Sequence, residues 1–191
     1  MKDLSSSLFE IDQLIVSKNI QTISLDIDGT LYPMKAVELR WWKSFVFSPI
    51  QALQFLLIRK RWERKRKGLT VSVTEKDKSN FEHVLLTLLC PRLVKFTTLY
   101  WLRGLKSRGL KAYYLTDHSV ELKMKALDLP KLDGAFDGLT LSGELKPHAT
   151  LAKDLNQALG INPLTHLHIG DRWSDEEQAR LMGCHFFKVE T

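Results

Sequence analysis

The sequence predicts an α/β protein built on a doubly wound parallel sheet, with a helical lobe inserted after the first strand. Segments of strand and helix type alternate through the second half of the chain, as they do in parallel sheets. The interval from 31 to 110, between the first strand and the next convincing central strand, is far longer than the dozen or so residues that a crossover needs. Polar residues follow several strands, where ligands bind in such sheets.

The first elements are a helix and a strand. Apolar residues recur at helical spacing over 5–18, and Ser7 and Glu10 have the spacing of a capping box. The apolar run 22–26 is the first predicted strand.

The interval that follows predicts helices rather than a loop, because its apolar residues are periodic and structureless loops of this length are uncommon. Helices are expected over 48–68, 79–91 and 93–108, with Pro49 starting the first and Gly68 ending it. The predicted domains are a lobe over 32–104 and a core formed by 1–31 and 105–191.

From 111 onward, strand and helix alternate. The predicted strands are 111–115, 165–169 and 185–189. The predicted helices between them are 119–128, 147–160 and 174–183. Residues 132–147 are interpreted as irregular.

Composition fits one globular unit of 191 residues with a small inserted lobe. Cys90 and Cys184 match no metal-ligand spacing and are too few for a disulfide framework, so we expect a reducing, cytoplasmic setting. The start of the chain lacks the features of a signal peptide, and no apolar run reaches the ~18 residues of a membrane span. The excess of basic residues behind the formal net charge of +6 is concentrated in 59–67, which holds seven basic residues and one acidic residue, Glu63.

Two aspartates end the first strand. Asp26 and Asp28 are two residues apart, so their side chains point the same way on an extended strand. Two carboxylates at that edge would repel each other unless a cation or a shared proton relieves them. Gly29 and Thr30 follow, and a glycine turn can direct backbone N–H groups at an anion. Carboxylates for a metal beside amides for an anion suit Mg²⁺-assisted phosphoryl chemistry.

Polar residues also follow two later strands. Thr116 and Asp117 end the second, and Asp171 follows Gly170 after strand 165–169, with Asp175 four residues on. Lys146 lies just before the helix that precedes that strand. In this order the motifs resemble those of the haloacid dehalogenase-like (HAD-like) hydrolase superfamily, most members of which are Mg²⁺-dependent phosphatases. The likeness covers the first strand and 111–189, with the middle segment in the place of the helical cap.

The resemblance implies a Rossmannoid core with strand order 5-4-1-2-3 and a role for each motif residue. Asp26 would be the nucleophile that forms an aspartyl-phosphate, and Asp28 the general acid and then base. Mg²⁺ would be held by Asp26, the backbone carbonyl of Asp28, Asp171 and Asp175. Thr116 and Lys146 would be catalytic and would bind the phosphoryl group. Further phosphate contacts are expected from Gly29, Thr30 and Asp117.

Several alternatives remain open at this level. Glu176 competes with Asp175 for the last acidic position, and His118 replaces the commoner Asn or Gly. Asp28 argues against a dehalogenase, because halide needs no proton to leave, and the Lys-Thr of P-type ATPases is missing after Asp26. Phosphomutases share the four motifs. The Leu-Tyr-Pro at 31–33 resembles pyrimidine 5′-nucleotidase-like members.

The lobe carries the expectations about substrate and partners. A small phosphorylated metabolite is the expected substrate, and Arg40, Trp41, Trp42 and Lys43 could contact it or simply pack. A second class of function follows from 59–67: a module that binds an anionic membrane surface or nucleic acid.

Overall fold

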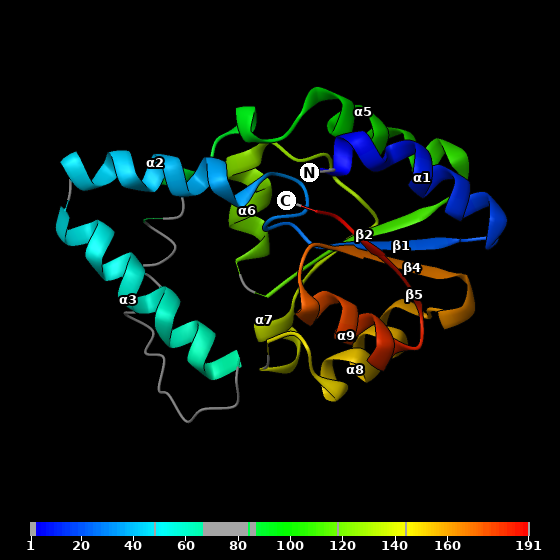
Figure 1. Ribbon diagram of the computed structural model, residues 1–191. Helices are drawn as coiled ribbons and strands as arrows, with labels where there is room; N and C mark the ends of the chain where they lie inside the picture. The colour runs from blue at the N-terminus through cyan, green and yellow to red at the C-terminus, as the bar shows by residue number, and fades with distance from the viewer. Residues whose placement is uncertain are drawn as a thin grey trace.

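The computed structural model describes residues 3–47, 49–66, 84, 87–117, 119–143 and 145–190 (Figure 1). A five-stranded parallel sheet forms its centre, in the order β3-β2-β1-β4-β5. The strands are β1 (Thr22–Leu25), β2 (Lys111–Thr116), β3 (Gly134–Asp137), β4 (His166–Gly170) and β5 (His185–Lys188). The predicted α/β class and strand order are therefore confirmed.

Helices cover both faces of the sheet (Figure 1). On one face lie α1 (Leu4–Ser17) and α5 (Phe96–Gly104), which contact each other. On the other lie α8 (Ala149–Leu159) and α9 (Trp173–Met182), which are also in contact. The apolar strands are buried between these layers, and Ile23, Leu25 and Leu167 are fully buried. The remaining core helices are α6 (Val120–Leu127) and α7 (Gly138–Ser142), with short 3₁₀ turns η1 (Pro91–Leu93), η2 (Lys106–Arg108) and η3 (Pro163–Thr165).

Aspartates cap the starts of α1 and α9. The predicted capping box of Ser7 and Glu10 is wrong, because α1 begins earlier: the Asp3 carboxylate caps it by accepting from the Ser6 N–H. Ser7 is buried inside the helix. The start of α9 is capped by Asp175, whose carboxylate accepts from the backbone N–H of Arg172 at 3.1 Å.

The interpretation of 132–147 as irregular is also wrong. This stretch forms β3 and α7, joined without a loop. Strand β3 has only four residues and none is fully buried, so its apolar signal is weak. Asp137 ends the strand and caps α7 by accepting from the Thr140 N–H at 3.1 Å.

After β1 the chain forms α2 (Met34–Phe47) and α3 (Pro49–Arg66), which pack against each other and extend away from the sheet (Figure 1). Helix α5, which the predicted division assigns to the lobe, packs on α1. The helix expected over 79–91 falls mostly outside the described residues; 84, 87 and 88 are helical. Among the described residues, no helix is long and apolar enough to cross a membrane.

Candidate active site

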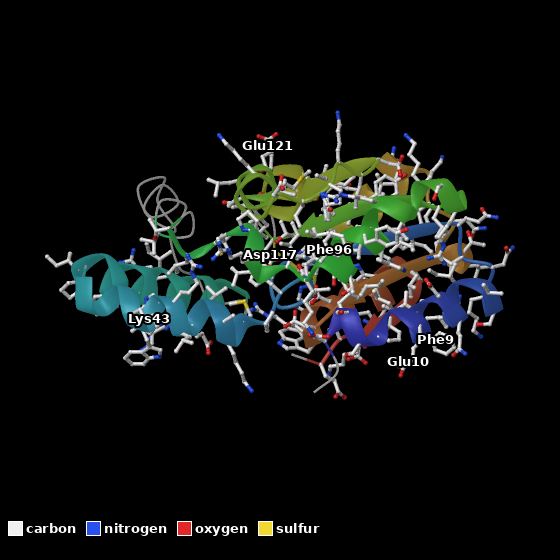
Figure 2. All side chains as sticks on the ribbon, turned by 90° about the horizontal axis from the view of Figure 1, so that it is seen from above. Phe9, Glu10, Lys43, Phe96, Asp117 and Glu121 are labelled. Carbon is white, nitrogen blue, oxygen red and sulfur yellow. The ribbon has the colours of Figure 1, made fainter. Side chains whose placement is uncertain are left out.

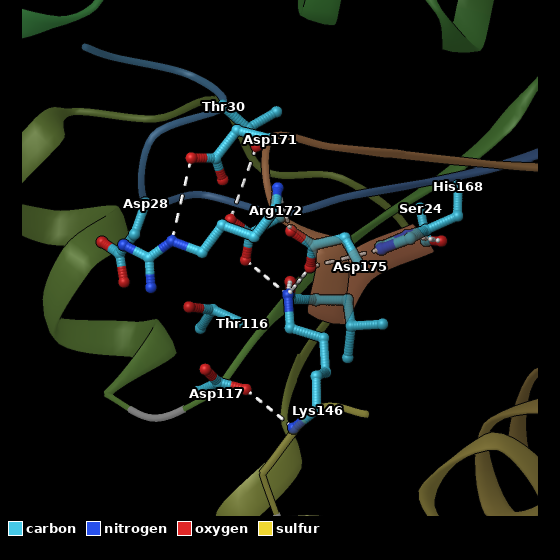
Figure 3. Close-up of polar contacts among 12 residues, drawn as sticks. Ser24, Asp28, Thr30, Thr116, Asp117, Lys146, His168, Asp171, Arg172 and Asp175 are labelled. Atoms are coloured by element: carbon cyan, nitrogen blue, oxygen red, sulfur yellow. Dashed lines mark hydrogen bonds and ion pairs between the residues drawn. The ribbon is translucent and has the colours of Figure 1, made fainter. Parts of the chain in front are cut away.

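The carboxyl ends of β1, β2 and β4 bring the predicted site residues together (Figure 3). Asp26 directly follows β1, and its backbone N–H donates to the Ile169 carbonyl of β4 at 2.9 Å. Asp26 is 5% exposed. Thr30, also buried, faces the Asp26 Oδ2 atom at 3.4 Å. The turn at Gly29 has a φ of +86°, which favours glycine over residues with a Cβ.

Lys146 joins the three motifs. Its Nζ atom donates to Asp26 Oδ1 at 2.6 Å and to Asp175 Oδ1 at 2.5 Å. Its backbone N–H donates to the Asp117 carboxylate at 2.9 Å, so Asp117 fixes the position of the segment that carries the lysine. Lys146 is 2% exposed, and these contacts replace the water that its ammonium gives up. Figure 3 shows Lys146 reaching toward Asp175 from below.

One ammonium shared by two buried carboxylates leaves negative charge uncompensated. Burial raises the pKa of Asp26 to about 8, although Lys146 opposes the shift. Burial also acts to raise the pKa of Asp175, but Lys146 and His168 hold it far below its usual range. Burial would lower the pKa of Lys146, but Asp175, Asp26 and Asp117 raise it well above its ordinary value. Lys146 therefore stays charged and paired with the ionised Asp175. The unfavourable burial of a second negative charge falls on Asp26, whose pKa is the one that rises.

A third carboxylate makes this cluster suitable for a cation. Oxygen atoms of Asp26, Asp171 and Asp175 lie within 4.8 Å of one another. Burial raises the pKa of Asp171 to about 6, against the opposing effect of Arg172. Hard oxygen donors from a few carboxylates, with water completing the shell, are the set that Mg²⁺ prefers. The donors present therefore fit Mg²⁺.

Two glycines make room for these acids. A Cβ atom on Gly29 would lie 2.2 Å from Asp171 Oδ2, and one on Gly170 would lie 2.4 Å from the Asp175 Cβ. Both approaches are closer than a real Cβ can make, so a side chain at either position would displace a carboxylate. The geometry favours Asp175 over Glu176 for the last acidic position: Asp175 belongs to the cluster and is 1% exposed, whereas Glu176 is exposed.

Asp28 lies in a second set of contacts. Its carboxylate forms an ion pair with the Lys123 ammonium at 2.5 Å and accepts a short hydrogen bond from the Tyr32 hydroxyl. Lys123 also donates to Thr116 Oγ1 at 2.8 Å, and both Lys123 and Thr116 are fully buried. The side chain of Asp28 is therefore not in the three-acid cluster. Its backbone carbonyl is the group that the resemblance assigns to the metal.

A chain of buried polar side chains continues from Asp175 into the sheet. His168 Nε2 lies 3.7 Å from Asp175 Oδ1, and its Nδ1 contacts Ser24 Oγ at 2.8 Å. Ser24 Oγ in turn contacts His166 Nε2 at 2.9 Å, and His166 Nδ1 contacts Thr22 Oγ1 at 2.6 Å. Burial lowers the pKa of both histidines, that of His166 to about 3, so both are neutral. With protons on both Nε2 atoms, every donor in the chain points toward Asp175.

Sequence reasoning missed three residues at this site. Lys123 occupies a position in the buried stripe of α6 formed with Val120 and Leu127, and a lysine in an apolar stripe is the signal that could have identified it. Tyr32 and Arg172 carry no comparable signal; the Arg172 Nε atom lies 3.8 Å from Asp171 Oδ2. His118 falls outside the described residues.

No family model matches the chain. A curated protein, phosphoglycolate phosphatase from Aquifex aeolicus (strain VF5), is 36% identical over 87 residues. The match covers 44% of this chain and 41% of that protein, so the chain spans about two fifths of the relative it matches.

Solved structures resemble the chain over most of its length. The HAD-hydrolase YfnB from Bacillus subtilis, bound to magnesium, has a TM-score of 0.67 at 14% identity, covering 87% of this chain and 85% of its own. CbbY from Rhodobacter sphaeroides, in complex with phosphate, has a TM-score of 0.64 at 16% identity, covering 90% and 87%. At these identities the likeness shows a shared fold.

Proposed function

Because the chain has the HAD-like hydrolase fold, we propose that it is a Mg²⁺-dependent phosphatase that hydrolyses a small phosphate monoester through an aspartyl-phosphate on Asp26. The observation that carries this proposal is that carboxylate oxygens of Asp26, Asp171 and Asp175 lie within 4.8 Å of one another at the carboxyl edge of the sheet, with Lys146 paired to Asp26 and Asp175. Ligands bind beyond this edge in doubly wound sheets.

In the first step, an oxygen of Asp26 attacks phosphorus, and the bond from phosphorus to the leaving oxygen breaks. Lys146 screens the negative charge on the nucleophile and on the transferring group, and Thr116 with the amides after Gly29 would bind phosphoryl oxygens. Mg²⁺, held by Asp26, Asp171, Asp175 and the Asp28 carbonyl, would neutralise charge on the phosphate.

Asp28 handles the protons in both steps. It gives a proton to the leaving alkoxide, then takes one from the water that attacks the aspartyl-phosphate and releases inorganic phosphate. Its contact with Lys123 favours the ionised carboxylate, which is the form that the second step needs. For the first step Asp28 must take up a proton before it can protonate the leaving group, and its contacts with Lys123 and the Tyr32 hydroxyl hold the carboxyl group in place.

The curated relative and the charges around the site indicate which substrates to test. The name of the curated relative makes phosphoglycolate the first ester to test. Arg172 adds a cation beside Asp171 that could meet a second negative group on a substrate. The helical pair α2–α3 follows the first motif directly, where a cap would exclude water from the phosphoenzyme.

The test is a screen of the purified chain against phosphorylated metabolites, with p-nitrophenyl phosphate as the activated reference. We expect release of inorganic phosphate that requires Mg²⁺ and is abolished by Asp26→Asn. The matched control is Asp12→Asn, which changes an acid on α1 that pairs with Arg108 at the surface.

Three outcomes contradict the proposal. Turnover that survives Asp26→Asn would show that Asp26 is not the nucleophile. Full activity in excess chelator would show that the reaction does not require a metal ion. An isomerised ester formed without net phosphate release identifies a phosphomutase, the alternative that shares the same motifs.

A further inference from the structure

One face of α3 carries apolar side chains followed by basic ones, all exposed to solvent. The apolar members are exposed by 73%, 51% and 50%, in chain order. At 3.6 residues per turn, the six positions fall within roughly 100° of arc. We call this set the α3 stripe: Ile50, Leu53, Leu57, Lys60, Arg61 and Arg64.

The α3 stripe lies away from the core. Ile58, adjacent to Leu57 but on the other side of the helix, is 3% exposed and faces inward. In Figure 1 α2 leads away from the sheet and α3 begins at its far end and runs back toward the core, and Figure 2 shows Lys43 of α2 well beyond the sheet. The stripe therefore presents aliphatic surface that the described part of the chain leaves in water, at a cost that a bound partner would relieve.

The charge pattern of the sequence specifies the chemistry of that partner. Residues 44–58 contain no charged side chain, and 59–67 then hold seven basic residues against Glu63. The seven exceed the whole formal net charge of +6, so the positive potential is concentrated at this helix. An uncharged apolar stretch beside a basic cluster is complementary to a surface with an apolar interior and anionic headgroups.

We propose that the α3 stripe binds the surface of membranes that contain anionic phospholipid. Ile50, Leu53 and Leu57 would enter the boundary between headgroups and acyl chains, while Lys60 and Arg64 would pair with lipid phosphates. The helix lies on the bilayer and does not cross it, in agreement with the absence of a spanning helix among the described residues. This inference is independent of the phosphatase proposal.

Nucleic acid fits the α3 stripe less well. Binding of single strands uses aromatic side chains on which bases stack, and the exposed uncharged members here are aliphatic. Phosphate contacts alone would leave Ile50, Leu53 and Leu57 in water. The aliphatic half of the stripe is accounted for by a bilayer and not by a polyanion.

The experiment is sedimentation of the full chain with phosphatidylcholine vesicles, with and without about 30% phosphatidylglycerol. We expect binding only to the anionic vesicles and weaker binding at high salt. Each cation near such a surface contributes about fivefold, so Lys60→Glu, Arg61→Glu and Arg64→Glu together should weaken binding by at least about a hundredfold. Replacing the three aliphatic residues by serine should weaken it by more than about tenfold.

A matched control removes the same charge elsewhere: Lys106→Glu, Lys131→Glu and Lys153→Glu together, all exposed on the core. This variant, and Asp26→Asn, should keep most of the vesicle binding. Unchanged circular dichroism and thermal unfolding establish that each variant is folded. Absence of vesicle binding overturns the proposal, as does equal loss in the two charge variants. Displacement from vesicles by a structured RNA that binds more tightly also overturns it.

Discussion

Replacing Lys146 by methionine tests the electrostatic account of the site through stability alone. The substitution keeps an unbranched chain of similar volume but removes the ammonium that contacts Asp26 at 2.6 Å and Asp175 at 2.5 Å. Both carboxylates are buried, so neither can recover its hydration. Breaking a buried ion pair by removing one partner costs about 3–5 kcal/mol. For a chain of this length each kcal/mol lowers Tm by about 2–4 °C, which gives an expected drop of about 6–20 °C in metal-free protein.

The pH and the metal should change this cost in defined directions. A buried carboxyl with a raised pKa favours the folded state when it is protonated, so the penalty should shrink as the pH falls from about 8 toward 5. Mg²⁺ should raise the Tm of Lys146→Met more than that of the parent, because the ion replaces part of the missing positive charge. Turnover should not recover, since the ion does not take the place of the ammonium.

The measurement is thermal unfolding with and without Mg²⁺ at both pH values. Lys153→Met, at an exposed position on α8, is the control and should lie within about 0.5 kcal/mol of the parent. A loss below about 1 kcal/mol for Lys146→Met, or a loss that Mg²⁺ does not reduce, would refute the shared-ammonium account.

Three further predictions concern the surrounding contacts. Asp28→Asn should keep metal and phosphate affinity but lose about 10²–10⁴ in kcat, most severely on esters with poor leaving groups; equal loss on activated and unactivated esters would remove the proton-donor role. Lys123→Met should show the same dependence on the leaving group and should be non-additive with Asp28→Asn, whereas additive effects would separate the two residues. Because burial lowers the pKa of His166 to about 3, its contribution to stability is present above pH ~6.5 and is lost as the pH falls toward 3. His166→Gln should flatten that slope in denaturant titrations, and an unchanged slope would assign it to other groups.

The core of the fold was predictable because its signals are local. Each of the four strands predicted in the sequence lies within one residue of an observed strand, since apolar runs of this length between turn residues have few other interpretations. The exception is β3, whose four half-buried residues begin with a glycine and lead directly into a helix. A short strand at the edge of the sheet lacks the continuous apolar run that marks a central parallel strand.

The site was predictable in its acids but not in its pairings. Asp26, Asp171 and Lys146 follow strands or precede a helix at positions that the topology brings to one edge. That Lys146 serves two carboxylates, and that Asp28 is held by Lys123, depends on side-chain directions that spacing does not encode. The distances in sequence are large: Lys146 is 120 residues from Asp26, and Lys123 is 95 from Asp28.

The alternation of side-chain direction along β1 links the site to the interior of the sheet. Ser24 and Asp26 are two residues apart, so their side chains leave the strand on the same face. A buried serine there would be costly unless it were bonded, and His166 and His168 of β4 supply its partners. His168 then faces Asp175, which shares Lys146 with Asp26. The polar residues of one sheet face thus form a connected set that leads to the nucleophile. A substitution at Ser24 should change the orientation of His168 and, through it, the position of the Asp175 carboxylate.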